Sequence, residues 1–211
     1  MADCYVQGSF AFICTHAEMA LIEEAFQASY DLEAGDTPGD PTPEFLTAFP
    51  PLEPGDPWSG FVAIFPDPDF PNFGVEFEGG SAFDRPEIST VHFYSTTDFQ
   101  PDALAQLIRH CCQETLRQAP IGFEWAFSCS RPRVGEFGGG ACAIFADRVV
   151  FETTRAMLER TLADGSAGTL PAEADGGWSE DPDHPLADWR TEVANDDTRL
   201  GYWPWVAARR A

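Results

Sequence analysis

The sequence predicts an α+β fold in which helices cover one face of an antiparallel sheet. Segments with apolar residues at every second position alternate with segments whose apolar residues recur at helical spacing. Their order is strand, helix, strand, strand, helix, strand, strand, helix, which contains the split β-α-β arrangement of the ferredoxin-like fold. The 211 residues are 44% hydrophobic and 13% aromatic, enough to bury a core. We therefore predict a ferredoxin-like sandwich with an extra C-terminal hairpin strand and helix.

The first two elements are a strand and a helix. Residues 4–14 predict the strand, with Phe10 and Phe12 on one face. Thr15-His16-Ala17-Glu18 fits a capping box, in which the two end residues satisfy each other's free backbone amides. Apolar residues follow at helical spacing, so we expect a helix over residues 16–31.

The next stretch, residues 33–60, is acidic and rich in Pro and Gly. This composition opposes regular structure and predicts a long surface loop, with one helical turn around residues 43–48. Residues 73–78 and 88–95 then alternate between apolar and polar side chains and predict two further strands.

Four elements complete the predicted domain. A second helix is expected to start at Pro101, because proline is favoured in the first turn of a helix, and to extend to Leu116. Residues 121–130 give the clearest alternation in the chain and predict a strand. Gly138–Gly140 predict a bulge or a tight hairpin before another strand at 141–146. A third helix is expected over residues 153–162.

The chain divides into an α+β domain at residues 1–163 and a tail at residues 164–211. The tail is dominated by Ala, Gly, Asp and Pro without a periodic pattern. We expect it to be loosely structured or docked on the domain through its tryptophans, which are Trp178, Trp189, Trp203 and Trp205. These tryptophans also allow another hypothesis, a structural or assembly component in which the tail tryptophans make the contacts.

Charge limits the function classes. The chain has 35 Asp and Glu against 12 Lys and Arg, a net charge of −23. Binding to nucleic acid phosphates needs Lys and Arg, so we expect no direct nucleic acid ligand. The same charge opposes binding to an anionic membrane surface. The first hundred residues hold 18 Asp and Glu and a single cation, Arg85, for a net charge of −17.

The concentrated charge predicts a partner-binding surface. Carboxylates held on a folded scaffold can imitate a phosphate backbone and engage the basic groove of a nucleic-acid-binding protein. The candidate residues are Asp31, Glu33, Asp36, Asp40, Glu44, Glu53, Asp56, Asp67, Asp69, Glu76, Glu78 and Asp84. Interleaved aromatic residues would supply apolar anchors for the partner. They are Phe45, Phe49, Trp58, Phe70 and Phe73.

The predicted sheet also allows an alternative of a different class. Strand alternation places Glu76, Glu78 and Glu124 opposite the helix-covered side, together with His92 and Tyr94. An enzyme or a small-ligand-binding domain could use this open face, with Glu124, His92 and Tyr94 around a concave, partly apolar site.

Motifs for chemistry are sparse. There is no P-loop, no Gly-x-Ser-x-Gly elbow and no dinucleotide fingerprint, so we expect no enzyme and no cofactor. The six cysteines include no Cys-x-x-Cys pair and the N-terminal residues show no export signal, which predicts reduced, mostly buried thiols, no metal site and a cytoplasmic location. Cys14, before the first helix, is a further nucleophile candidate with His16 or His92 as its base.

Three stretches together resemble a known family. They are Phe10–Thr15 leading into Glu18, His92–Ser95, and Ile121–Ser130 running on to Glu136–Ala141. The family consists of acidic proteins of unknown function carried by bacterial phages, plasmids and integrative elements, and the resemblance spans roughly residues 4–160. It implies a mobile-element context and no catalytic residues.

Charge and context lead to one functional hypothesis. We expect a non-enzymatic interaction protein of a mobile genetic element that inhibits a host nucleic-acid-binding defence complex, either CRISPR or restriction machinery. Its partner would be a basic protein or complex, approached in place of DNA.

Overall fold

The computed structural model describes residues 3–81, 88–131, 136–166, 181–195 and 202–210. The chain forms two compact units, residues 1–158 and 159–211, and each is described by itself. The boundary lies inside one helix, α6 (Thr154–Ser166), a few residues before the expected boundary at residue 163.

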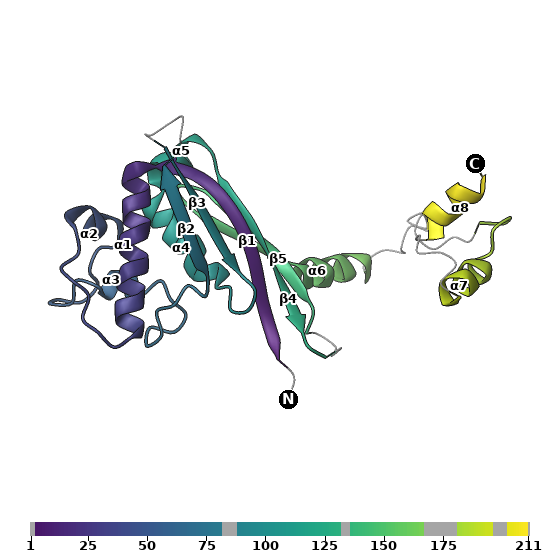
Figure 1. Ribbon diagram of the computed structural model, residues 1–211, viewed down its shortest axis with the longest axis horizontal. Coiled ribbons are helices and arrows are strands. Elements are labelled where there is room, and N and C mark those ends of the chain that lie inside the picture. The colour runs from purple at the N-terminus through teal and green to yellow at the C-terminus, as the bar shows by residue number, and fades with distance from the viewer. Residues whose placement is uncertain (1–2, 82–87, 132–135, 167–180, 196–201, 211) are drawn as a thin grey trace. The chain divides into compact units, whose positions relative to one another are not determined.

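The first unit contains a six-stranded sheet in the order β2-β3-β1-β4-β5-β6, and every neighbouring pair is antiparallel (Figure 1). The strands are β1 (Cys4–Thr15), β2 (Glu76–Ser81), β3 (Ile88–Ser95), β4 (Ile121–Cys129), β5 (Gly138–Ile144) and β6 (Val149–Thr153). This sheet confirms the predicted α+β class. The sequence did not reveal β6, whose five residues are too few for a clear alternation.

Helices α1 and α4 pack against each other; α1 also contacts β1 and β3, and α4 contacts β5 (Figure 1). The helices besides α6 are α1 (His16–Glu33), α2 (Pro43–Ala48), α3 (Ser59–Val62), α4 (Pro101–Cys111), α5 (Gln113–Gln118), α7 (Leu186–Ala194) and α8 (Tyr202–Arg210). The single helix expected from Pro101 to Leu116 is two helices, because Cys112 leaves the helical conformation at φ −106°, ψ 38°. None of the described helices is long and apolar enough to cross a membrane.

The start of α1 has the predicted capping box, and its acid has a second role. Glu18 is 5% exposed and accepts the backbone N–H of Thr15 at 2.9 Å. The same carboxylate accepts the backbone N–H of Thr115 at 2.9 Å and its hydroxyl at 2.5 Å. A buried carboxylate is tolerated when hydrogen bonds satisfy it. Glu18 therefore joins the start of α1 to α5, a contact that the local motif does not reveal.

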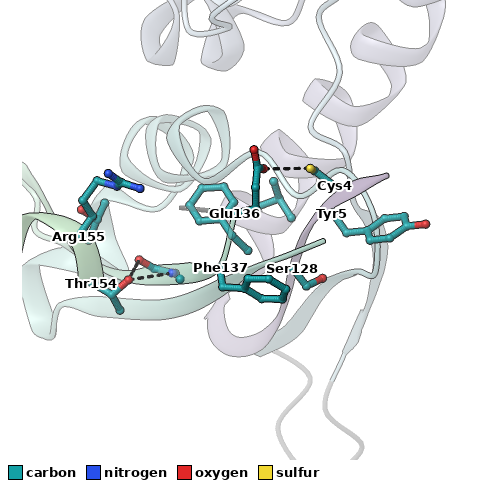
Figure 2. A pocket seen from close by; sticks show the side chains of 12 residues that line it. Cys4, Tyr5, Ser128, Glu136, Phe137, Thr154 and Arg155 are labelled. Carbon is teal, nitrogen blue, oxygen red and sulfur yellow. Dashed lines mark hydrogen bonds between the residues drawn. The ribbon is translucent and has the colours of Figure 1, made fainter. Parts of the chain in front are cut away.

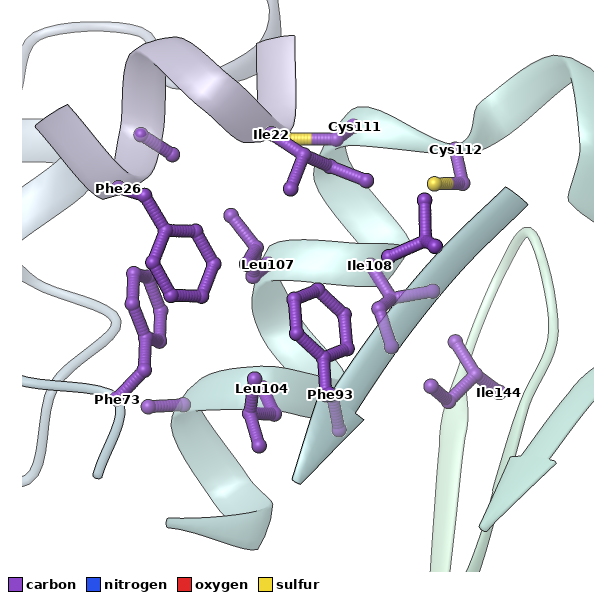
Figure 3. Packing of buried hydrophobic residues seen from close by; sticks show 14 of the residues in the cluster. Ile22, Phe26, Phe73, Phe93, Leu104, Leu107, Ile108, Cys111, Cys112 and Ile144 are labelled. Carbon is purple, nitrogen blue, oxygen red and sulfur yellow. The ribbon is translucent and has the colours of Figure 1, made fainter. Parts of the chain in front are cut away.

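The main core lies between α1, α4 and the sheet (Figure 3). Phe93 of β3 is fully buried, and its ring lies 5.6 Å from that of Phe26 on α1. Leu104 and Leu107 of α4 are fully buried in the same cluster. Four cysteines, Cys14, Cys111, Cys112 and Cys142, are also buried, as the sequence predicted for most of the thiols.

The three glycines at the start of β5 pair in register with β4 and do not form the predicted bulge or tight hairpin. Gly140 is paired with Trp125 of β4, which is 7% exposed. A Cβ at Gly140 would lie 2.4 Å from Cζ2 of Trp125 and 2.8 Å from the carbonyl oxygen of Glu152. Glycine is needed here because the indole packs directly on the backbone.

The predicted loop is a packed segment. We call residues 31–75, from the last turn of α1 to the residue before β2, the acidic lobe. Its helix α2 confirms the predicted turn at 43–48, and α3 adds another. The lobe has an aromatic cluster that is continuous with the main core, with ring centroids 4.8–5.5 Å apart along the chain of contacts. The cluster consists of Phe45, Phe49, Trp58, Phe61, Phe65 and Phe73.

This cluster corrects one prediction. Phe45, Phe49, Trp58 and Phe73 were expected to be exposed anchors for a partner, and all four are at most 8% exposed. Of the predicted anchors only Phe70 is at the surface, with 66% of its side chain exposed. The aromatic side chains are buried because the lobe would otherwise have no core to oppose its conformational entropy.

Helix α4 holds the lobe through His110. Its Nδ1 lies 2.7 Å from the carbonyl oxygen of Ala48, and its ring stacks on Phe49 at 4.9 Å. The carbonyl can only accept, so Nδ1 donates. Burial lowers the pKa of His110, because desolvation disfavours the imidazolium.

The second unit has contacts between its own helices. Trp205 of α8 is 4% exposed, and its Nε1 donates to Glu192 Oε2 of α7 at 2.8 Å. Arg209 pairs with the same carboxylate. The indole hydrogen bond and the guanidinium lower the pKa of Glu192. The segment expected to be loosely structured thus contains a helix pair, while Trp178 lies outside the described residues.

We predict that Phe61→Ala lowers the free energy of unfolding by about 3–5 kcal/mol, because it opens a cavity in the aromatic cluster. Phe70→Ala removes the same ring from an exposed site of the same lobe, and we expect a change within about 0.5 kcal/mol. Denaturant unfolding monitored by tryptophan fluorescence measures both. Equal losses in the two variants would contradict the buried cluster.

We also predict a pH dependence from His110. The pKa of His110 is lower in the folded protein than the value of 6.5 expected in the unfolded chain. The folded state therefore has its full stability above pH 6.5, where the imidazole is neutral in both states. It loses stability as the pH falls from 6.5 toward the pKa of the folded state. The variant His110→Asn keeps a side-chain donor and cannot titrate. The stability of wild type relative to this variant should therefore decrease between about pH 8 and about pH 5. A difference that is constant over this range would contradict the assignment.

Candidate functional site

The predicted partner-binding carboxylates are at the surface. All of the described members are exposed except Asp31, which is half-buried, and Asp84 lies outside the described residues. Residues 3–81 and 88–100 contain no Lys or Arg. Among the described residues, no arginine is within ion-pair distance of these carboxylates; Glu78 pairs with His92 at 3.9 Å. Apart from the contact of Glu78 with His92, their charge is uncompensated within the described structure.

Four of these carboxylates gather around two adjoining clefts of the acidic lobe. Asp36, Asp40 and Asp56 line a cleft of about 450 Å³. Asp31 and Asp40 line a second cleft of about 210 Å³, and Trp58 contributes to both. Small clefts edged by carboxylates suit the guanidinium or ammonium groups of a partner. All four were among the carboxylates predicted to bind a partner, but no sequence pattern distinguishes them from the other members of that set.

Hydrogen bonds fix the lobe and two of these carboxylates. Asp56 Oδ1 accepts the backbone N–H of Trp58 at 2.9 Å, and Asp31 Oδ1 accepts the side chain of Gln27 at 2.8 Å. Glu24 of α1 accepts both the backbone N–H and the hydroxyl of Thr42, each at 2.7 Å. The clefts are thus held against α1 in a defined arrangement.

The other members of the set are dispersed. Glu33 accepts the side chain of Asn72 at 2.7 Å, and Asp67 accepts the backbone N–H of Asp69 at 3.1 Å in a turn. Glu44 and Glu53 are exposed away from the two clefts. These residues contribute to the general negative potential more than to one defined site.

Glu76 and Glu78 lie on the open face of the sheet, as predicted. The hydroxyl of Tyr94 is 2.9 Å from Glu78 Oε1 and 3.0 Å from Glu76 Oε2. These two hydrogen bonds raise the pKa of Tyr94 to about 12. His92 Nε2 lies 3.0 Å from the hydroxyl of Ser9, so the five side chains form one polar network.

Ser9, His92 and Glu78 contact one another in the sequence serine, histidine, carboxylate that is found in a nucleophilic triad. The histidine lies 3.0 Å from the serine and 3.9 Å from the carboxylate. A triad also needs a substrate cleft and oxyanion donors. The cleft beside Tyr94 and the cleft beside Glu124 are lined by neither Ser9 nor His92. The geometry is that of a surface network.

The residues of the alternative hypothesis share a face but line different clefts. Tyr94 lines a cleft of about 450 Å³ together with Glu76 and Asp98. Glu124 lines another, of about 390 Å³, beside β5 and the first turn of α6. His92 lines neither of the two. The described residues thus do not gather Glu124, His92 and Tyr94 around one cavity.

Cys14 lacks the access that a nucleophile needs. Its side chain is 2% exposed, and it hydrogen-bonds Cys112, which raises the pKa of Cys112 well above the ordinary range of a thiol. His16 Nδ1 lies 2.7 Å from the hydroxyl of Ser89. Burial in the core explains Cys14 better than catalysis.

A cluster of two thiols and a carboxylate was missed by the sequence analysis. Sγ of Cys4 lies 3.5 Å from Sγ of Cys129 and 3.1 Å from Oε2 of Glu136. The hydrogen bond to Glu136, followed by that to Cys129, raises the pKa of Cys4 to about 12. The three donors can hold a metal ion. Strand pairing sets Cys4 opposite Cys129, and the hydrogen bond from Cys4 holds Glu136 beside the pair.

No family model matches the chain, and no curated protein or solved structure is significantly similar to it. The functional inference therefore depends on the residues and the geometry described above.

We predict that Tyr94 ionises at higher pH than an ordinary tyrosine, whose pKa is 10. Ionisation would break the two hydrogen bonds that the hydroxyl donates to Glu78 and Glu76, and it would place a third negative charge beside the two carboxylates. An ultraviolet pH titration of wild type minus Tyr94→Phe should give a midpoint near 12. In a Glu76→Gln/Glu78→Gln background the midpoint should move toward 10, the ordinary value of the group. A midpoint near 10 in the protein that retains Glu76 and Glu78 would show that Tyr94 does not make these two hydrogen bonds.

Proposed function

We propose that this chain is a non-enzymatic, acidic interaction protein of a mobile genetic element, located in the cytoplasm. It inhibits a nucleic-acid-binding defence complex of the host, of the CRISPR or restriction type, by occupying the complex's basic groove in place of DNA. Within this proposal, β1 to β4 with α1 and α4 form a ferredoxin-like sandwich, for which the strand order β2-β3-β1-β4 is the support.

The observation that carries the proposal is uncompensated charge on a fixed scaffold. Asp31, Asp36, Asp40 and Asp56 edge two adjoining clefts, and no described arginine pairs with them. A phosphate backbone likewise presents anionic oxygens at fixed spacing without internal cations. Such a surface attracts a basic groove at long range and places each carboxylate for a partner's Arg or Lys.

The burial of the aromatic residues changes how the contact is made. With the lobe's rings buried in the core, the exposed apolar groups near the carboxylates are few, and they include Phe70 and Leu52. Binding would then depend on charge-assisted hydrogen bonds and respond strongly to salt.

The test compares two triple variants in a bacterial host that carries an active CRISPR or restriction system. Expression of the wild type should raise the plating of a targeted phage. The variant Asp36→Asn/Asp40→Asn/Asp56→Asn keeps side-chain shape and the capping acceptor at position 56 but removes three charges from the clefts. We expect binding to the purified defence complex to weaken by about 100-fold, at about 1 kcal/mol for each lost ion pair.

The matched control is Glu114→Gln/Asp147→Asn/Glu159→Gln. It removes the same net charge at exposed positions outside the acidic lobe. We expect it to retain nearly full inhibition and binding. Equal behaviour of the two variants, or binding that is insensitive to salt and to competing DNA, would contradict the proposal.

A further inference from the structure

One end of the sheet brings together three metal-ligand side chains from distant parts of the chain. Cys4 is the first residue of β1, Cys129 is the last residue of β4, and Glu136 precedes β5. Figure 2 shows the carboxylate of Glu136 directed at the sulfur of Cys4. One ligand atom from each of the three side chains lies within 4.8 Å of the others.

The separations suit tetrahedral zinc. With Zn–S bonds of about 2.3 Å and Zn–O bonds of about 2.0 Å, tetrahedral angles place two sulfurs about 3.8 Å apart and a sulfur and an oxygen about 3.5 Å apart. The observed distances are 3.5 Å between the sulfurs and 3.1 Å from Cys4 Sγ to Glu136 Oε2. Movements of a few tenths of an ångström would admit the ion.

The backbone around the donors is held in place by pairing of the strands. Cys4 and Cys129 are direct partners in the β1–β4 ladder. Just outside that pair, the N–H of Ser130 donates to the carbonyl of Asp3 at 2.8 Å, and the N–H of Asp3 donates to the Ser130 hydroxyl at 2.9 Å. The two thiols are therefore preorganised on adjacent strands, which reduces the entropy lost on binding.

We propose that Cys4, Cys129 and Glu136 form a zinc-binding site. Thiolates favour zinc over hard cations such as Mg²⁺ and Ca²⁺, which take oxygen ligands. Binding converts two thiols and one carboxylate into ligands and releases the two thiol protons to solvent. The strongly negative protein adds a favourable potential for a cation.

The cluster borders a pocket of about 450 Å³ (Figure 2). Cys4 and Glu136 line this pocket, and so do the exposed rings of Phe127 and Phe137. Three protein ligands with one position left to water are the arrangement of an open zinc site. This inference goes beyond the proposed partner binding, because none of its ligands belongs to the acidic lobe.

The test is calorimetric titration of the reduced, full-length protein with zinc and, separately, with magnesium. We expect one zinc per chain, and about two protons released when buffers of different ionisation enthalpy are compared at neutral pH. Unspecific binding to surface carboxylates would release none, since these are already ionised. Zinc should also raise the Tm, because it binds the folded state.

Cys4→Ser and Glu136→Gln test the ligands. Cys4 is exposed, so its replacement leaves the core unchanged. We expect Cys4→Ser to weaken zinc binding by about 100-fold or more, and Glu136→Gln to weaken it without changing the proton count. Asp3→Asn removes a neighbouring charge and no ligand, and its affinity should stay within about twofold.

Either of two results would overturn the site. One is that magnesium binds as tightly as zinc, or that zinc binding releases no protons. The other is an affinity that Cys4→Ser and Asp3→Asn change equally. Neither result affects the proposal that the acidic lobe binds a partner, because that proposal is tested with separate variants in the lobe.

Discussion

Electrostatic repulsion within the acidic lobe is the constraint on which the rest of the structure depends. The first hundred residues have a net charge of −17, and no described residue among them is Lys or Arg. Holding those carboxylates close together requires apolar burial elsewhere, and the lobe obtains it from Phe45, Phe49 and Phe61, which are at most 1% exposed. The aromatic cluster thus makes the charged surface possible, which is why its rings are unavailable to a partner.

The sheet distributes the remaining polar chemistry between two places. Alternation along β2 and β3 sends Glu76, Glu78 and Tyr94 to the open face, where they form a hydrogen-bonded network. At the far end of β1, pairing with β4 places Cys4 against Cys129. The first place depends on local period-two patterning and the second on long-range register, and this difference decides which of them a sequence can reveal.

Local signals in the sequence were reliable where a short motif controls the backbone. The Thr15–Glu18 capping box and the proline-started turn at Pro43–Ala48 are both present as predicted. The break at Cys112 and the strand Val149–Thr153 were missed, because neither has a local signature and both depend on packing. The aromatic residues of the lobe were assigned to the surface because composition alone does not distinguish a packed irregular segment from a solvated loop.

The sequence by itself determined the α+β class, the faces of the strands and the excess of carboxylates, because side-chain alternation and charge are properties of neighbouring residues. Only the tertiary structure decided that Asp31, Asp36, Asp40 and Asp56 share two adjoining clefts and that Cys4, Cys129 and Glu136 meet. Those groupings arise from contacts between residues far apart in the chain. Such contacts are set by strand register and by the packing of the core, which no local pattern encodes.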